Sequence, residues 1–274
     1  MSFTRVKRRV GWQIAGVLLL VAVFALSTPA GAITWGQPDY DHPYGGAILL
    51  QWRGVWMEFC SGSLVAPRVF LTAGHCTVFL EELSVPLESL RVSLSRELFA
   101  PGATWLEVSA VHTHPDYRWG PQSDPHDVGV LILKEPVTDV VPGRLPSEGF
   151  LDALAASGML KDARFINVGY GADETMSPNR KVVPSTDARM FSVSGFRNLH
   201  EAWLYLSQNV HLGNGGTCYG DSGGPTIYRD DAGGETIVAV TSWGDGPCKS
   251  TNNNYRVDTA SSLAFVWEMI RGNP

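Results

Sequence analysis

The sequence predicts an all-β fold in which antiparallel strands form a sandwich or a barrel. Short runs with strand character recur along the chain, and turn signals such as Pro101-Gly102 and Pro115-Asp116 separate them. The 29 glycines and 17 prolines among 274 residues also favour turns and short strands over long helices. Examples of the expected strands are Ala47–Trp52, Gly62–Val65, Val69–Leu71, Leu90–Leu94, Trp105–His112, Val128–Leu133, Arg164–Gly169, Ala202–Leu206 and Ile237–Ser242.

Two segments predict helices. Leu151–Ala156 is short, and Asp258–Arg271 is longer, with Asp258 as the expected N-cap and Gly272 after its last turn. Apolar residues of the longer segment recur at helical spacing, which indicates a terminal helix packed on the body of the protein. They are Leu263, Val266, Trp267 and Ile270.

Residues 1–32 predict a secretory signal peptide. A basic start is followed by an apolar stretch from Ile14 to Leu26 and by the small residues Ala30-Gly31-Ala32. The alternative is an uncleaved membrane anchor. The full apolar run from Val10 to Leu26 has 17 residues, which is short for a span. We therefore expect a protein that is secreted, to the extracellular space or the periplasm.

Removal of the predicted signal peptide makes the remaining chain more acidic. It takes away four basic and no acidic side chains, so the formal net charge falls from −6 to −10. An acidic protein of this kind is not expected to bind nucleic acid. Export to an oxidising compartment favours two disulfides for the four cysteines over a zinc site, since no C-x-x-C spacing is present. The segment 142–149 is the expected boundary between two halves of similar size.

Three segments carry residues suited to acyl-transfer chemistry. A turn of small residues presents His75, whose ring can act as a general base near neutral pH. Asp127 opens a strongly apolar strand, where a buried carboxylate needs a partner such as a histidine N–H. Ser222 lies between glycines, whose backbone N–H groups can converge on an oxyanion. Together they are the set required for nucleophilic catalysis.

These segments resemble the chymotrypsin-like serine proteases, which have the trypsin fold. The resemblance rests on T-A-G-H-C around His75, D-V-G-V-L from Asp127 and G-D-S-G-G-P around Ser222, in the family's chain order. That order excludes subtilisins and α/β-hydrolases. The resemblance implies two six-stranded antiparallel β-barrels with a C-terminal α-helix. Residues 33–145 would form the first barrel, and residues 146–274 the second barrel and the helix.

The resemblance also implies a role for each residue of the site. His75 would act as general base and acid, Asp127 as its orienting carboxylate and Ser222 as the nucleophile. The amides of Gly220 and Ser222 would form the oxyanion hole, and the hydroxyl of Ser242 would support Asp127. The implied reaction is hydrolysis of peptide bonds through an acyl-enzyme, without a cofactor or a metal.

Two disulfides and an activation contact follow from the same resemblance. The family pairs Cys60 with Cys76 and Cys218 with Cys248. Members of the family are activated when a new N-terminal amine pairs with the aspartate before the nucleophile. Cleavage after residue 32 would expose Ile33, and the corresponding aspartate is Asp221. Signal peptidase itself is therefore expected to create the active N-terminus.

The resemblance predicts an uncharged specificity pocket. Trypsin-like members carry an aspartate six residues before the nucleophile, where this chain has Gly216. Glutamate-specific members carry a histidine where this chain has Thr241. We therefore expect apolar or aromatic side chains to be accepted, unless Asp245 or Asn253 changes the pocket. The expected pocket residues are Gly216, Thr217, Trp243, Gly244 and Asn253.

Alternatives to this interpretation remain at this stage. The chain could be a catalytically inactive homologue that serves as a secreted binding protein, because a fold does not guarantee an activity. A metal cluster is a further alternative to solvated loop histidines; its residues would be His112, His114, His126, Asp116 and Asp124. For the enzyme we expect a protein or peptide substrate, no membrane contact after signal removal, and a monomer.

Overall fold

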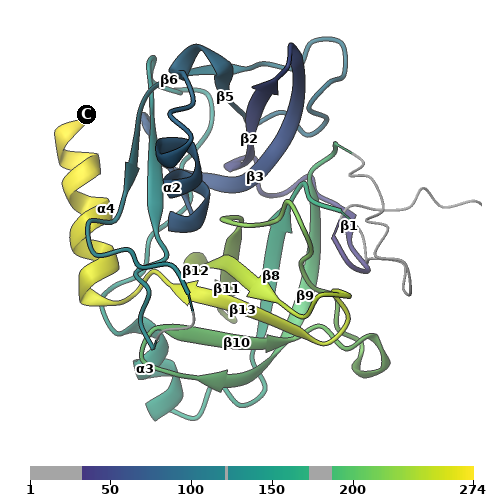
Figure 1. Ribbon diagram of the computed structural model, residues 1–274. Helices are drawn as coiled ribbons and strands as arrows, with labels where there is room; N and C mark the ends of the chain where they lie inside the picture. The colour runs from purple at the N-terminus through teal and green to yellow at the C-terminus, as the bar shows by residue number, and fades with distance from the viewer. Residues whose placement is uncertain (1–32, 121–122, 173–186) are drawn as a thin grey trace, which may run out of the picture. The chain divides into compact units, whose positions relative to one another are not determined.

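The structure is a computed structural model that describes residues 33–120, 123–172 and 187–274 (Figure 1). The predicted signal peptide lies outside the described residues. The predicted fold class is confirmed: the strands form two closed six-stranded antiparallel barrels, and a helix ends the chain. Within the described part of the chain, no helix is long and apolar enough to cross a membrane.

The first barrel closes in the strand order β2-β3-β4-β7-β6-β5. Its interior is filled by apolar side chains that are fully buried, such as Ile48, Leu64 and Leu131. The strands are β2 (Gly45–Trp52), β3 (Val55–Ala66), β4 (Val69–Thr72), β5 (Leu90–Ser93), β6 (Leu106–Thr113) and β7 (Gly129–Leu133).

The second barrel closes in the order β9-β10-β13-β12-β11-β8, because β8 also pairs with β9. Its strands are β8 (Arg164–Gly169), β9 (Met190–Leu199), β10 (Trp203–Ser207), β11 (Pro225–Arg229), β12 (Glu235–Gly244) and β13 (Thr251–Arg256). The expected division after residue 145 falls between the two sets of strands. One short strand crosses it: β1 (Gln37–Pro38) pairs with β9 of the second barrel.

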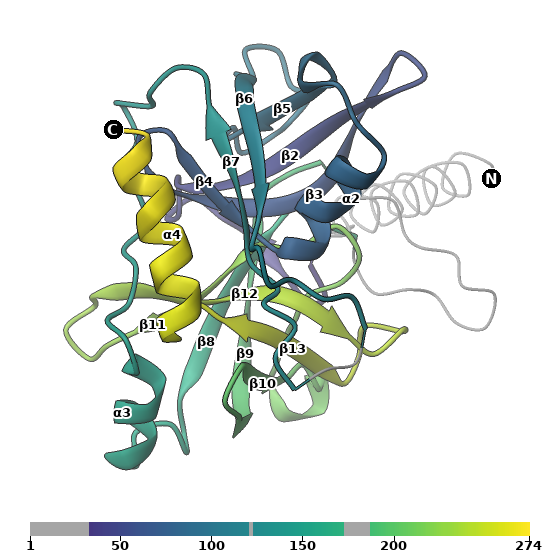
Figure 2. The same ribbon diagram turned by 60° about the vertical axis from the view of Figure 1, so that its left-hand side comes forward.

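Three helices accompany the barrels. Helix α2 (Gly74–Glu82) follows β4 and was not among the expected elements, whereas α3 (Phe150–Ala156) and α4 (Ala260–Gly272) were. Helix α4 belongs to the C-terminal half but lies along the first barrel, in contact with β4 (Figures 1 and 2).

The expected N-cap of the last helix was wrong. Thr259 caps α4, and its side chain accepts a hydrogen bond from the amide of Ser262. Asp258 instead accepts a hydrogen bond from the amide of Leu151 at 2.8 Å, in the first turn of α3. Its carboxylate also pairs with Arg256 at 2.8 Å. Asp258 therefore ties two distant segments together instead of starting its own helix.

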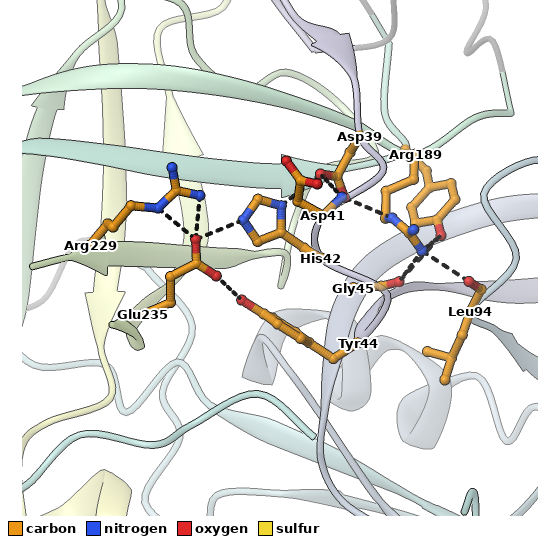
Figure 3. Close-up of polar contacts among 10 residues, drawn as sticks. Asp39, Asp41, His42, Tyr44, Gly45, Leu94, Arg189, Arg229 and Glu235 are labelled. Carbon is orange, nitrogen blue, oxygen red and sulfur yellow. Dashed lines mark hydrogen bonds and ion pairs between the residues drawn. The ribbon is translucent and has the colours of Figure 1, made fainter. Parts of the chain in front are cut away.

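A partly buried network of charges anchors the segment that leads from β1 into the first barrel (Figure 3). His42 lies between two carboxylates, with Nδ1 2.6 Å from Asp39 and Nε2 3.3 Å from Glu235. Arg189 donates to the other oxygen of Asp39 at 2.8 Å, and Arg229 donates to Glu235 at 2.8 Å. The network joins the N-terminal segment to the β11–β12 hairpin of the second barrel.

Candidate active site

The pairing of β4 with β7 brings His75 and Asp127 together. Thr72 at the end of β4 lies opposite Gly129 at the start of β7. His75 follows Thr72 by three residues, and Asp127 precedes Gly129 by two, so both reach the same end of the barrel. His75 takes the second position of α2, which directs its ring toward the carboxylate.

The contact between these two residues has three hydrogen bonds. Nδ1 of His75 lies 3.0 and 3.2 Å from the two oxygens of Asp127, and the backbone N–H of His75 donates to the same carboxylate at 2.7 Å. The hydroxyl of Ser242, at the end of β12, donates to the other side of Asp127. Asp127 is buried, while the side chain of His75 remains 21% exposed.

Electrostatics favours the charged form of both partners. Burial alone would raise the pKa of Asp127, but the charge of His75 and the hydrogen bonds from His75 and Ser242 outweigh burial and lower it. Burial alone would lower the pKa of His75, but the charge of Asp127 and their hydrogen bond raise it. The arrangement suits a ring that takes up a proton while an adjacent carboxylate stays ionised.

Backbone contacts hold Ser222 against the first barrel. Ser61 of β3 donates from its amide to the carbonyl of Ser222 at 2.8 Å, and from its hydroxyl to the carbonyl of Gly220 at 3.0 Å. The amide of Gly223 donates to the carbonyl of Thr241 on β12 at 2.8 Å. The described contacts do not include a hydrogen bond between Ser222 and His75, and such bonds are often long in unliganded enzymes.

The loop before Ser222 leaves two amides available. The amide of Asp221 donates to Cys218, and those of Gly223 and Gly224 also have partners. Among the described residues, no group accepts from the amides of Gly220 and Ser222. Gly220 has φ of 96°, and a Cβ there would lie 2.7 Å from an oxygen of Glu58. Glycine is required at this position for both reasons.

A cavity of about 210 Å³ adjoins Ser222. Of the expected pocket residues, Thr217, Trp243 and Gly244 line it, but Gly216 and Asn253 do not. The remaining lining residues are Cys218, Tyr219, Thr241, Ser242, Asp245 and Cys248. Asn253 lines a different hollow, next to Arg197 and Tyr205.

Both disulfides have the pairing that the resemblance implied. Cys60 is bonded to Cys76, which follows His75, and Cys218 is bonded to Cys248 beside the cavity. The sulfur atoms of Cys60 and Cys76 and a ring nitrogen of His75 lie within 4.8 Å of one another. These sulfurs are bonded to each other, so they do not form a thiolate metal site.

The histidines of the alternative metal cluster make other contacts. The rings of His114 and His126 are stacked at 4.7 Å, and both bond to the hydroxyl of Ser261 on α4, at 3.1 and 3.3 Å. The second ring nitrogen of His114 accepts a hydrogen bond from the amide of Asp116 at 3.2 Å. His114 and His126 therefore connect their loop to the last helix through these ring nitrogens.

Ile33 and Asp221 are both fully buried. Ile33 packs against Met190, and Thr34 pairs in a β-bridge with Gly216, six residues before Ser222. The carboxylate of Asp221 accepts hydrogen bonds from the amides of Gly171 and Cys218, both at 2.8 Å. This segment thus reaches the second barrel close to the loop that carries Asp221.

Two residues of the site have no motif that could have revealed them. Glu58 on β3 points an oxygen at Gly220, and its other oxygen is buried without a hydrogen-bond partner among the described residues. Burial, together with the charges of Asp221 and Asp187, raises the pKa of Glu58 well above its usual value. Gln208, after β10, is fully buried behind the cavity. Only the folded arrangement places either residue near Ser222.

Two closed β-barrels, with a His–Asp pair from the first and a serine loop from the second, define a protein of the serine protease class. The trypsin family matches residues 33–267, and the chain belongs to this family. A trypsin of Saccharopolyspora erythraea is 27% identical over 214 residues, which cover 75% of this chain and 83% of the relative.

Two further relatives come from animals. Trypsin 5G1 of Aedes aegypti is 29% identical over 223 residues, covering 77% of this chain and 75% of the relative. Bovine coagulation factor XII is 27% identical over 241 residues, covering 83% of this chain but 37% of the longer relative.

Proposed function

We propose that the protein is a secreted serine endopeptidase in which Ser222, His75 and Asp127 form the catalytic triad. The observation that carries this proposal is the contact between His75 and Asp127, supported by Ser242, next to a serine loop with two available amides. Membership in a family of serine proteases supports the reaction class.

In the proposed reaction, Oγ of Ser222 attacks the carbonyl carbon of the scissile peptide bond. Nε2 of His75 takes the hydroxyl proton, and the amides of Gly220 and Ser222 donate to the oxyanion of the tetrahedral intermediate. His75 then gives this proton to the leaving amine as the C–N bond breaks. Asp127 stays ionised and stabilises the imidazolium.

The resulting acyl-enzyme is an ester of Ser222. A water molecule attacks the carbonyl carbon of this ester while His75 takes a proton from the water. A second tetrahedral intermediate then forms in the same oxyanion site. The proton returns to Ser222, and the carboxylic acid product leaves. Every step uses groups of the chain, the substrate and water.

Maturation forms part of the proposal. Signal peptidase would cleave before Ile33 and release a secreted enzyme whose new ammonium group pairs with Asp221. The burial of both residues and the bridge between Thr34 and Gly216 support this arrangement. The ion pair would hold the loop from Gly220 to Ser222 in the shape that binds an oxyanion.

A fluorophosphonate probe tests the proposal, because it reacts with an activated serine whatever the substrate preference. We expect labelling of the processed protein at Ser222, and loss of both labelling and peptide hydrolysis in Ser222→Ala. A processed, folded protein that is not labelled would instead be a catalytically inactive homologue that acts as a binding protein.

A further inference from the structure

Gln208 lies directly behind the cavity beside Ser222 and connects two of its walls. Its side-chain oxygen accepts a hydrogen bond from the amide of Thr217 at 2.9 Å. Its side-chain nitrogen donates to a carboxylate oxygen of Asp245 at 3.4 Å. Thr217 and Asp245 both line the cavity, so the amide of Gln208 joins two lining residues from behind the cavity wall.

Gln208 also occupies the space that a side chain at position 216 would need. A Cβ added to Gly216 would lie 1.8 Å from the side-chain oxygen of Gln208 and 2.2 Å from its Cβ. Atoms cannot approach this closely, so no side chain fits at position 216 while Gln208 keeps its place. The neutral amide of Gln208, eight residues earlier in the chain, therefore occupies the space where the resemblance predicted a pocket side chain.

Asp245 is the one carboxylate among the described residues that line the cavity, and its oxygens are already engaged. They accept hydrogen bonds from the amides of Lys249, Ser250 and Thr251 at 3.0, 2.9 and 2.6 Å, in addition to the bond from Gln208. These contacts close the loop that carries Cys248. These hydrogen bonds partly neutralise the carboxylate and hold it in its own loop.

Three other polar side chains of the cavity wall direct their hydroxyl groups to the protein. The hydroxyl of Thr217 donates to Asn252 at 2.9 Å, and that of Ser242 donates to Asp127. The hydroxyl oxygen of Thr241 is buried rather than exposed to the cavity. The volume of about 210 Å³ exceeds the roughly 150 Å³ of a protein cavity that binds benzene, so an aromatic ring fits.

We propose that Gln208 determines the substrate preference of this protease, by closing the pocket with a neutral group and keeping Asp245 bound to its own loop. The favoured substrates are then peptides with an apolar or aromatic side chain on the acyl side of the cleaved bond, and arginine and lysine are disfavoured. This inference rests on the proposed function and assigns its substrate class.

The test compares peptides that differ only in this side chain: phenylalanine, leucine, arginine or lysine. All rates are normalised to the amount of enzyme that a fluorophosphonate labels. We expect the wild-type kcat/KM for phenylalanine or leucine to exceed that for arginine or lysine at least tenfold. A preference for arginine or lysine in labelled enzyme overturns the inference alone. Absence of labelling overturns the proposed function, and the inference with it.

A set of variants then tests the part played by Gln208. Gly216→Asp alone should give little labelled enzyme, because the new side chain collides with Gln208. Gln208→Ala combined with Gly216→Asp should restore labelling and raise the ratio of arginine to phenylalanine cleavage at least tenfold. The matched control is Gln208→Met with Gly216→Asp, which should stay impaired because methionine fills the same space.

Two outcomes contradict the assignment of Gln208. One is a single Gly216→Asp variant that is fully labelled and cleaves arginine peptides as well as the Gln208→Ala double variant. The other is equal behaviour of the alanine and methionine double variants. If removal of the buried amide prevents folding of the alanine variant, the wild-type peptide series still decides the substrate class.

Discussion

The backbone N–H of His75 and its ring Nδ1 both hydrogen-bond to the same carboxylate oxygen of Asp127, at 2.7 and 3.2 Å. The carboxylate therefore fixes the start of helix α2 and the orientation of the imidazole together. A proton on Nδ1 is required for the ring contact, which leaves Nε2 free of a proton and able to accept one.

Asp127→Asn should remove this tautomer control. The amide nitrogen of asparagine can donate to Nδ1 and so favour the wrong tautomer, while the fold stays intact. We expect kcat to fall by about 10⁴-fold with a small change in KM. Steady-state kinetics on a peptide substrate measures this, with Asp116→Asn in a nearby loop as the control. A loss below tenfold would show that Asp127 does not orient His75.

The pH dependence of activity should report the raised pKa of His75. The unprotonated ring is the base, so activity is lost as the pH falls through the pKa of His75 in the free enzyme. Because Asp127 raises this pKa, the midpoint of the acid limb of kcat/KM should lie above the ordinary histidine value of about 6.5. A midpoint below that value would mean that burial of the ring outweighs the carboxylate.

Glu58→Gln should stabilise the protein at neutral pH. The folded state holds the proton of Glu58 more tightly than the unfolded state does, since its pKa is raised. The folded state therefore loses stability as the pH rises from about 4.3 through the folded pKa. Glutamine cannot ionise, so we expect a gain at pH 7 of about 1.4 kcal/mol for each unit by which folding raises this pKa, up to pH 7, and a much smaller gain near pH 4.

Urea unfolding of Glu58→Gln at both pH values measures the difference. Glu268→Gln on the exposed face of α4 is the matched control and should change stability little at either pH. An equal effect of Glu58→Gln at pH 4 and pH 7 would show that ionisation of Glu58 is not the cause.

His42 should contribute stability with the opposite pH dependence. Burial lowers its pKa, but its contacts with Asp39 and Glu235 raise it above the ordinary value. A raised histidine pKa gives stability that is complete below about pH 6.5 and is lost as the pH rises through the folded pKa.

His42→Gln should therefore cost about 3 kcal/mol near pH 5.5, where it breaks a buried charge network. The cost should shrink as the pH rises through the folded pKa of His42, because the wild-type ring then loses its charge as well. Unfolding measured at pH 5.5 and pH 9 tests this. His211, which is exposed in the short 3-10 helix Val210–Leu212, provides the control substitution His211→Gln. A pH-independent difference would mean that packing of the ring, not its charge, holds the segment.

The fold class and most strands could be predicted from the sequence, because alternating apolar runs and turn residues are local signals. Strand β13 (Thr251–Arg256) escaped because its centre is Asn252-Asn253-Asn254, and asparagine is rare in strands. These side chains are buried, and Asn252 donates to Asn167 at 3.0 Å. Hydrogen bonds to residues far away in the sequence satisfy these buried side chains, so the segment can form a barrel strand. A local sequence pattern does not reveal such partners.

The candidate site likewise has some residues that the sequence could predict and some that it could not. His75, Asp127 and Ser222 lie in short motifs that could be found in the chain. Gly216 and Asn253 were expected at the pocket but do not line it, and Gln208, which bonds to two of the lining residues, was not expected. Which residue forms the base of a pocket depends on how segments from different strands pack, so position relative to a motif did not reveal it.

The mature protein should begin at Ile33. Ile33 is fully buried and has φ of 68°, a left-handed conformation that is strained for a β-branched residue. Cleavage after residue 32 removes the peptide bond that defines this angle, so the strain is released and the new ammonium group becomes available to Asp221. N-terminal sequencing of fluorophosphonate-labelled, secreted protein should therefore yield Ile33-Thr34-Trp35-Gly36. Active protein that begins at any other residue would contradict maturation by signal peptidase alone.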